Sequence, residues 1–266
     1  MHPLITRSSG RFSSLILLAV TVITVGGCNL NLSTDVEAKD QWTRTYPLTA
    51  DGTLLLATTN GQIDITGGDT DKVTITAERI VRAGTEEAAK QQLALFEMKE
   101  DVSPSRVSID SSSRGVTINV SRRVNYTVTL PRTASVTLTS TNGEITVSNI
   151  GGHFAAESTN GRITGTGLQK SAQVSTSNGV IALTFDNVGA EGIRADTTNG
   201  TVTISIPTST NAELSARVTN GVITHENLNL QVAESSRRRV DGRLGTGGPL
   251  IRLETTNGAI TIRGRQ

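Results

Sequence analysis

The dipeptide Asn-Gly occurs seven times within one recurring sequence frame, and this repeat constrains the fold more than any other feature. In each copy an apolar residue stands six and four positions before the asparagine, Thr or Ser immediately before it, and Ile or Val three positions after it. The seven residues are Asn60, Asn142, Asn160, Asn178, Asn199, Asn220 and Asn257. Internal repetition of this kind is typical of arrays whose units bury their apolar faces against one another. The repeat therefore predicts that most of the chain builds a scaffold.

Two all-β architectures are compatible with the repeat. In an antiparallel meander, each Asn-Gly would be a tight hairpin turn. In a β-solenoid, each would be a corner, and equivalent residues would stack about 4.8 Å apart. Successive asparagines from Asn142 to Asn220 are 18, 18, 21 and 21 residues apart, about one coil each, and a hairpin does not explain the uniform Ile/Val column. We therefore expect a single-stranded β-solenoid with Asn-Gly corners and a structural ladder of asparagines.

The first 28 residues have the features of an export signal. Arg7 and Arg11 precede an apolar stretch over residues 15–25, and Val-Gly-Gly stands immediately before Cys28, the only cysteine of the sequence. Because small residues before a cysteine resemble a bacterial lipobox, we expect cleavage after residue 27 and lipidation of Cys28. The alternative is an ordinary signal peptide with a chance cysteine. The lipid predicts anchoring in the bacterial cell envelope, on the periplasmic face or at the cell surface.

These features predict three segments: a signal peptide over 1–27, a lipidated cysteine with a flexible tether over 28–45, and a β-solenoid domain over 46–266. The domain contains two predicted insertions, a helix over 85–98 with Thr85 as N-cap and a Gly/Arg-rich segment over 228–249. Removal of residues 1–27 takes away two of the 25 basic residues and none of the 24 acidic ones. The remaining chain is nearly neutral, so its net charge predicts no general attraction to nucleic acid.

Several segments resemble a known bacterial family. The segments are Leu54 to Ile65, Tyr126 to Pro131, the Thr-Asn-Gly coils, and the Gly-Thr-Gly-Gly sequence that starts at Gly245 and leads to the last coil. They are similar to the β-strand-repeat proteins called domain of unknown function 4097, whose members are often labelled adhesins. The resemblance covers residues 46–266. It implies a β-solenoid-like fold in the envelope and no enzymatic activity, because the family has no established catalytic residues to carry over.

Acid–base catalysis needs titratable groups that converge on one place. His153 and His225 stand alone on different coils, and we expect His225 to face inward because its column is otherwise apolar. Three acids, Glu157, Asp196 and Glu254, share the column three positions before the asparagine with neutral residues and an arginine. We interpret this column as a solvated face. A polysaccharide lyase or hydrolase on a β-helix, the enzymatic alternative, would need such groups clustered on adjacent coils.

No metal or cofactor site is expected. The segment from Gly67 to Asp71 has the composition of a calcium turn, but a single copy is better explained as an ordinary turn. The lone cysteine is assigned to lipidation, which excludes thiolate metal sites.

Two surfaces remain as candidate binding faces. Hydroxyl residues four and six positions after the asparagine are expected to form an outward array: Thr146, Ser148, Thr164, Thr166, Thr184, Thr203 and Ser205. Threonine suits strands whatever their function, yet such an array also resembles an ice-binding surface and would suit a glycan or a protein. The second surface is the arginine-rich C-terminal end, where anionic contacts are expected from Arg237, Arg238, Arg239 and Arg243. Lipid phosphates or anionic cell-wall polymer would suit these side chains, and a solvated loop is the alternative.

The sequence thus predicts a lipid-anchored, non-enzymatic envelope protein that binds or organises an envelope or surface partner. The expected partners are the membrane, through the N-terminal lipid, and a cell-wall or surface glycan or an envelope protein. No cofactor, metal or nucleic acid is expected. A carbohydrate-active enzyme and an accessory protein of envelope-stress signalling are the alternatives.

Overall fold

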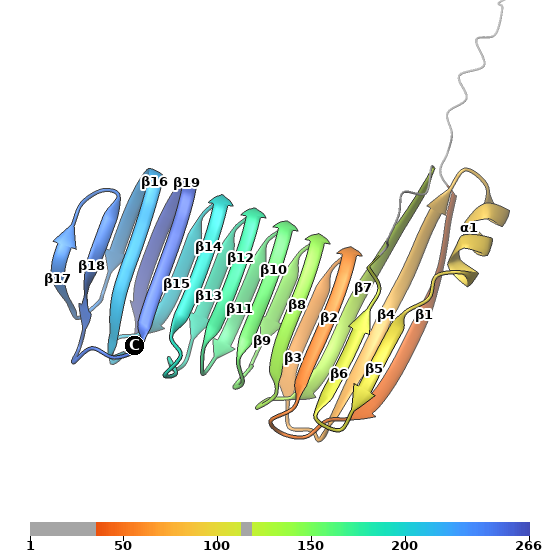
Figure 1. The fold of residues 1–266 in the computed structure, drawn as a ribbon, viewed down its shortest axis with the longest axis horizontal. Helices are drawn as coiled ribbons and strands as arrows, with labels where there is room; N and C mark the ends of the chain where they lie inside the picture. The colour runs from red at the N-terminus through yellow and green to blue at the C-terminus, as the bar shows by residue number, and fades with distance from the viewer. Residues whose placement is uncertain (1–35, 113–118) are drawn as a thin grey trace, which may run out of the picture. The chain divides into compact units, whose positions relative to one another are not determined.

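In the computed structural model, 19 strands form one hydrogen-bonded sheet that folds into two facing rows (Figure 1). The structure describes residues 36–112 and 119–266. These residues belong to the compact unit Thr34–Gln266, which is separate from the unit Met1–Ser33. The predicted signal peptide, 1–27, and Cys28 therefore lie outside the described residues.

Five repeats build the centre of the two rows. One strand of each repeat ends at the asparagine, and the next strand begins at the Ile or Val three residues later. Row A contains β2 (Thr53–Asn60), β8 (Ser135–Asn142), β10 (Phe154–Asn160), β12 (Ala172–Asn178) and β14 (Ile193–Asn199). Row B contains β3 (Ile63–Gly68), β9 (Ile145–Ser148), β11 (Ile163–Leu168), β13 (Ile181–Phe185) and β15 (Val202–Pro207).

Neighbouring strands within each row are parallel and in register. Asn142 pairs with Asn60 and Asn160 in row A, and Ile145 pairs with Ile63 and Ile163 in row B. A meander would place neighbouring strands antiparallel, so the pairing excludes it for these repeats. The all-β class is as predicted, and the central repeats stack as coils of a solenoid.

The core lies between the two rows and follows from the alternation along each strand. Val136 and Leu138 face inward from row A, and Ile145 and Val147 face inward from row B, each at most 1% exposed. Because side chains of a strand alternate between its two faces, the intervening residues point to solvent. Every coil thus contributes the same inward positions to one continuous apolar core.

The glycine after each asparagine allows the coils to approach closely. Gly200 has φ of +157°, and a Cβ at this residue would lie 1.8 Å from the carbonyl oxygen of Gly179. No side chain fits at that separation, so the spacing between coils requires glycine at this position.

The N-terminal end of the stack is mixed. In row B, β1 (Val36–Pro47) and β4 (Lys72–Ala83) are antiparallel, as are β4 and β7 (Val120–Pro131), whereas β7 is parallel to β3. In row A, β5 (Lys99–Ser103) pairs antiparallel with β6 (Arg106–Asp110), and β6 pairs parallel with β2.

Two boundaries at this end differ from the prediction. The predicted tether, 28–45, is wrong over residues 36–45, because β1 pairs with β4 along its whole length and packs Ala38 against the core. Helix α1 (Glu86–Ala94) begins after Thr85, whose side chain accepts a hydrogen bond from the backbone N–H of Ala88. It ends before the predicted Met98, since the chain turns at Leu95 and buries Phe96. No helix of the described segments has the length and apolar character to span a membrane.

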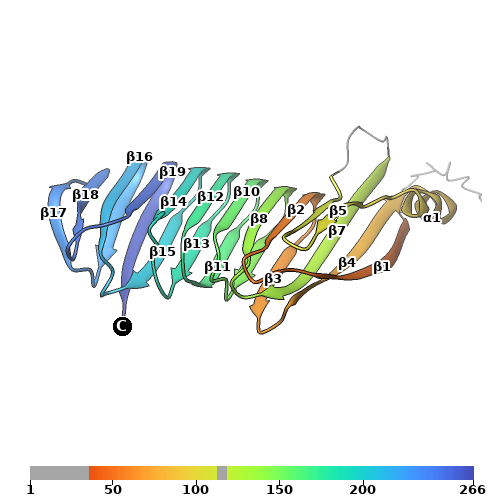
Figure 2. The ribbon, with the colours of Figure 1, turned by 60° about the horizontal axis from the view of Figure 1, so that its bottom comes forward.

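The C-terminal end departs from sequence order. The chain leaves β15 into β16 (Ala212–Glu226), forms the hairpin β17 (Leu230–Ser235) and β18 (Arg239–Leu244), and returns as β19 (Leu250–Arg265). Strand β19 lies between β14 and β15 on one side and β16 on the other (Figures 1 and 2). The last coil is therefore inserted into the stack and does not follow its predecessor.

The predicted Gly/Arg-rich insertion, 228–249, folds as this hairpin, and β18 pairs antiparallel with the first half of β16. A solvated loop, the alternative for this segment, is therefore wrong. Both β16 and β19 continue through their Asn-Gly without a break, so Asn220 and Asn257 do not end strands. A purely single-stranded solenoid with sequential coils describes the centre of the chain and not its two ends.

Candidate functional site

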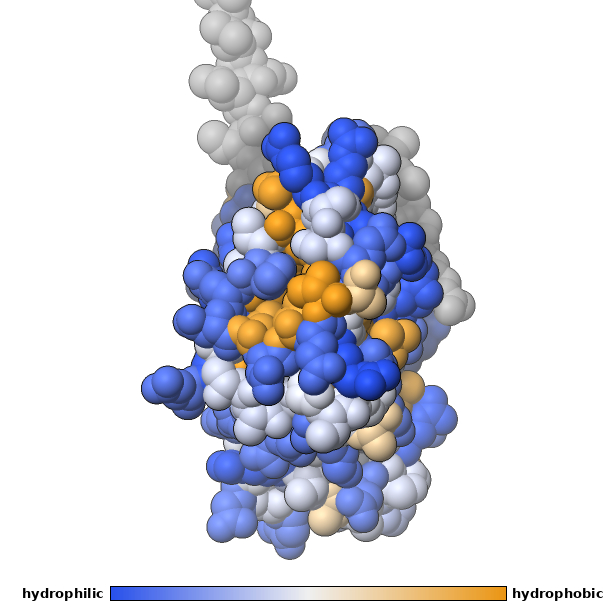
Figure 3. Space-filling view, turned by 90° about the vertical axis from the view of Figure 1, so that its left-hand side faces the viewer, coloured by the Kyte–Doolittle hydropathy of each residue, from blue (hydrophilic) through white to orange (hydrophobic). Residues whose placement is uncertain are grey.

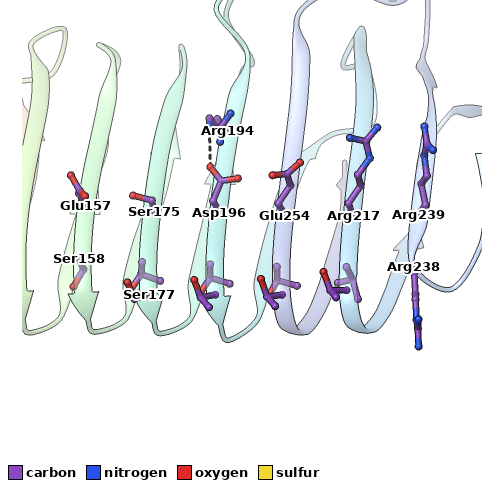
Figure 4. A pocket seen from close by; sticks show the side chains of 17 residues that line it. Glu157, Ser158, Ser175, Ser177, Arg194, Asp196, Arg217, Arg238, Arg239 and Glu254 are labelled. Atoms are coloured by element: carbon purple, nitrogen blue, oxygen red, sulfur yellow. Dashed lines mark ion pairs between the residues drawn. The ribbon is translucent and has the colours of Figure 1, made fainter.

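A groove of about 750 Å³ lies on the outer face of row A, over β10, β12, β14, β19 and β16, and reaches the turn between β17 and β18. One line of side chains, each in register with the next, crosses it from strand to strand (Figure 4). In spatial order these residues are Glu157, Ser175, Asp196, Glu254, Arg217 and Arg239. We call this set the charged line.

The insertion of β19 creates the charged line. Asp196 and Glu254 are register partners on β14 and β19, and Arg217 on β16 comes next. Had the coils followed sequence order, Arg217 would separate the two acids. The column lies on an outer face with exposed or half-buried side chains, and the strand order divides it into an acidic half and a basic half.

Each acid of the pair is bound by an arginine two residues earlier on its own strand. The distance from Arg194 Nε to Asp196 Oδ2 is 2.7 Å, and that from Arg252 Nη2 to Glu254 Oε1 is also 2.7 Å. Burial raises the pKa of the Asp196 carboxyl above its ordinary value; Arg194 opposes this shift, and Glu254 adds to it.

The basic half is more neutralised than the sequence predicts. Arg239 is within 2.6 Å of Asp241 and 3.1 Å of Glu234, and Arg243 is 3.0 Å from Glu213. Two further arginines of this end also have acidic partners: Arg263 is 2.6 Å from Glu226, and Arg265 is 2.8 Å from Asp186. Several of these acids come from other parts of the chain, so counting charges within the segment overestimated its basic character.

Three arginines of the groove and hairpin, Arg217, Arg237 and Arg238, form no ion pair within 4 Å among the described residues, although the charge of Arg217 helps to lower the pKa of the nearby Asp241. The carbonyls of Arg237 and Arg238 accept hydrogen bonds from the backbone N–H groups of Ile223 and Val218, at 3.0 and 2.9 Å. The backbone of the hairpin turn is thus attached to β16, while its guanidinium groups stay available to an anion.

The seven asparagines form one continuous column of side chains. Six hydrogen bonds of 2.8–2.9 Å join them, each from the amide Nδ2 of one asparagine to the Oδ1 of the asparagine before it in the column. Their order is Asn60, Asn142, Asn160, Asn178, Asn199, Asn257 and Asn220, which follows the inserted position of β19. Beyond the first rung, Asn60 donates to the carbonyl of Arg122 at 3.1 Å. The amides are occupied with one another, which gives the column a structural role.

The hydroxyl array lies on the outer face of row B. The predicted residues, exposed or half-buried, are Thr146, Ser148, Thr164, Thr166, Thr184, Thr203 and Ser205. Register pairing extends the array over β7, β4 and β1, to Thr127, Thr129, Thr74, Thr76, Thr43 and Thr45. These strands lack the Asn-Gly frame, and for that reason the repeat did not reveal them. Neighbouring hydroxyl oxygens lie close together, as at Ser148 and Thr66, 3.2 Å apart.

The two histidines have different environments. His225 lies in the inward column, in register with the buried Ile262, but it is exposed because β16 is the last strand of row B among the described residues. His153 Nδ1 lies 2.8 Å from Ser171 Oγ, and that hydroxyl donates to Glu191 Oε2 at 2.8 Å. Because Ser171 is buried and gives its proton to a carboxylate, this cluster lacks the serine-to-histidine hydrogen bond of an activated nucleophile.

The part of the chain that the structure describes has no group of three or more His, Cys, Asp or Glu side chains placed to hold a metal ion. The end of the stack formed by β17 and β18 carries an apolar patch among hydrophilic side chains (Figure 3). Val232 of β17 is 50% exposed. The edge strand β17 has an irregular register between Val232 and Glu234. A bulge and a charge on an edge strand oppose the addition of another strand.

Two rows of parallel strands, joined coil by coil through a repeated Asn-Gly, make this a β-repeat protein. Residues 32–263 match the family Toastrack DUF4097, and the chain belongs to that family. No curated protein matches the sequence. A proposed cell adhesion protein from Clostridium sporogenes has a similar structure, with 12% identity, a TM-score of 0.39 and coverage of 85% of this chain and 100% of that one. A proposed adhesin from Bacteroides fragilis is also similar, with 15% identity, a TM-score of 0.39 and coverage of 86% of this chain and 98% of that one.

Proposed function

We propose that the protein is a lipid-anchored, non-enzymatic component of the cell envelope, and that the groove on row A contacts its partner. The observation that carries this proposal is the charged line, which gathers acids and arginines from five strands on one outer face. Fixed strands hold these side chains in register, and sites built on strands are more sharply positioned than sites on loops. Ion pairs within the groove and its open form favour binding over catalysis.

Anchoring is supported by the sequence before Cys28, the predicted lipidation site. The test is metabolic labelling of the native host with an alkyne-bearing fatty acid, followed by separation of membrane and soluble fractions. The wild-type chain is expected to be labelled and to sediment with membranes, and Cys28→Ser to be unlabelled and released. Labelling of the Cys28→Ser chain, or none of the wild type, would exclude lipidation at this residue.

The binding surface is tested by a photo-crosslinking amino acid at one of two exposed positions. Ser177 lies in the groove of row A, and Thr166 lies in the hydroxyl array of row B. We expect crosslinks to an envelope component from position 177 and few from position 166. The reverse pattern would move the binding face to the hydroxyl array. Mass spectrometry of the product distinguishes a cell-wall or surface partner from a membrane sensor, which would favour the signalling role.

One observation favours the enzymatic alternative. Asp196 and Glu254 are adjacent carboxyls, and burial raises the pKa of Asp196, as in pairs that divide the roles of acid and ionised carboxylate. The test compares hydrolysis of cell-envelope polysaccharides by the wild type and by the double variant Asp196→Asn/Glu254→Gln. Equal, background rates are the expected result. Turnover by the wild type that the double variant loses would replace the binding proposal with catalysis.

A further inference from the structure

We infer that the groove selects an extended zwitterionic peptide, whose ammonium group binds at Asp196 and Glu254 and whose carboxylate binds at Arg217. This inference rests on the proposed function and names the ligand class of the same groove. Its first support is the order of charges, because the acids occupy β14 and β19 and the arginines the next two strands, β16 and β18. A ligand with one sign of charge would be repelled by half of the line.

The second support is the exposed position of Arg217. Strands β14 and β19 each carry an arginine and an acid two residues apart, but β16 carries Ser215 where its neighbours carry an arginine. Arg217 therefore has no partner on its own strand. Its neighbour Glu254 is held by Arg252, and its other neighbour, Arg239, is held by Asp241 and Glu234.

Like charges placed opposite each other across two strands are destabilising, and Arg217 is the register partner of Arg239. An anion from the ligand would relieve this repulsion. A carboxylate suits the guanidinium group because it can accept two parallel N–H hydrogen bonds.

The acidic half of the charged line also has a side chain whose hydrogen-bonding capacity is not fully used. Asp196 and Glu254 are neighbouring carboxylates whose side chains are 25% and 31% exposed in the groove. Asp196 Oδ2 is bound by Arg194, while Oδ1 is buried and has no hydrogen-bond partner among the described residues. An ammonium group offers three donors for the exposed oxygens of the two acids, and a rotation of the Asp196 side chain would bring Oδ1 to the same group.

The remaining lining favours a peptide over a saccharide. No aromatic side chain lines the groove, so it has no ring on which the face of a sugar could stack, and Val218 is its only aliphatic lining residue. Hydroxyls follow the charged line on the same strands: Ser177, Thr198, Thr256 and Thr219. Such hydroxyls are donors and acceptors for the amide groups of a peptide backbone.

Strand spacing sets the length of the peptide. Strands in a row are about 4.8 Å apart, so the centre of the acid pair and the centre of the arginine pair, two strands away, are separated by about 10 Å. A fully extended tripeptide spans about 10 Å. The probe is therefore Gly-Ala-Gly in four forms: with both ends free, N-acetylated, C-amidated, and blocked at both ends.

The experiment measures binding of each form to the full-length protein in neutral detergent at low salt, by ligand-observed NMR titration. Exposed ion pairs contribute about 0.2–1 kcal/mol each, so blocking one end is expected to weaken binding by about 1.4- to 5-fold. The doubly blocked peptide is expected to bind most weakly, and added salt to remove most of the difference between forms.

Variants assign each end of the peptide. In Arg217→Gln, the free and C-amidated peptides should bind equally, while N-acetylation keeps its effect. In the double variant Asp196→Asn/Glu254→Gln, which removes both acids of the ammonium site, the free and N-acetylated peptides should bind equally. Arg162→Gln, which removes an exposed arginine outside the groove, should behave as wild type and serves as the matched control. Thermal unfolding of each variant verifies that the stack is intact.

Equal affinity of the four peptides, absence of binding by all of them, or a uniform loss in Arg217→Gln would overturn the ligand class. Crosslinking from Ser177 separates this failure from failure of the proposed function. If position 177 captures an envelope partner while the peptides give one of these results, the groove binds something else. If it captures none as well, both proposals fall.

Discussion

The coils from β8 to β15 and the C-terminal strands β16 to β19 use the same repeat frame in different ways. In the first region each coil stacks on the one before it, and the column three before the asparagine holds Thr139, Glu157, Ser175 and Asp196. In the second region the last coil enters beside β14, and the same column continues with Glu254 and Arg217. The same inward positions build the core in both regions, so the outward side chains can differ in charge from strand to strand without changing the core. The groove that we propose as the binding surface lies where strand order departs from chain order.

Removal of residues 249–266 should have the largest effect, because it takes away β19 from the middle of the C-terminal stack. Ile251, Leu253, Ile260 and Ile262 are fully buried. At about 1.5–3 kcal/mol for each such side chain, the loss is about 6–12 kcal/mol, as large as the net stability of a typical domain. Hydrogen exchange should show lost protection in β14–β18 and retained protection in β8–β11, since coils contact mainly their neighbours. Ile260→Ala is a graded control, expected to cost about 2–5 kcal/mol. A truncated chain with the wild-type melting temperature would contradict the inserted position of β19.

Gly200→Ala should come next. Its Cβ would lie 1.8 Å from the Gly179 carbonyl oxygen, so neighbouring coils must separate, at a cost of about 1–3 kcal/mol or more. Gly84→Ala is the matched control, because a Cβ there has no atom within 4 Å, and its effect should stay within about 0.5 kcal/mol. Urea unfolding measures both. Equal effects would mean that coil spacing does not depend on glycine.

The asparagine column offers a smaller effect that compares the two regions directly. Asn160 makes two rungs, one with Asn142 and one with Asn178, whereas Asn220 ends the column with one rung. At about 0.5–1.5 kcal/mol per hydrogen bond, the two rungs of Asn160 mean that Asn160→Ala should cost about 1–3 kcal/mol, and Asn220→Ala about half as much. If the two variants unfold at the same urea concentration, the rungs contribute nothing measurable.

The smallest effect concerns the pH dependence of stability at Asp196. The pKa of this carboxyl is raised in the folded protein, so the folded state holds its proton over a range where the unfolded state has lost it. Stability should therefore decline as pH rises from the unfolded pKa of Asp, about 3.9, through the raised folded value. Asp196→Asn should remove this part of the decline and be neutral or slightly stabilising at pH 7. A variant whose stability varies with pH as in the wild type would assign the titration elsewhere.

Much of the stack can be predicted from the sequence because patterns of neighbouring residues determine it. Alternation within each repeat places the core columns, Thr85 marks the start of α1, and the spacing of asparagines favours stacked coils. The place of β19 is not predictable in this way: every coil has the same columns at its edges, so β14 could accept β16 or β19 equally well. The charged line depends on that choice, and with it the meeting of Asp196 and Glu254.

Two other differences between the prediction and the structure, at β1 and at His225, also have a physical reason. Strand β1 has mostly polar residues because it is an edge strand with a single buried side chain, Ala38, and such a strand resembles a tether in sequence. His225 occupies an inward column, but its strand ends row B and leaves the position uncovered. In both cases neighbours in space, which the repeat does not specify, decide the environment.

The inserted strand also has a consequence for biosynthesis. Residues 250–265 occupy the space between β14 and β16, so the C-terminal part of the stack cannot close until the final residues of the chain have been synthesised. During synthesis, β14 exposes the edge that β19 will occupy. The groove on row A, which β19 helps to line, forms only at that step, and a chain interrupted before residue 250 lacks this groove.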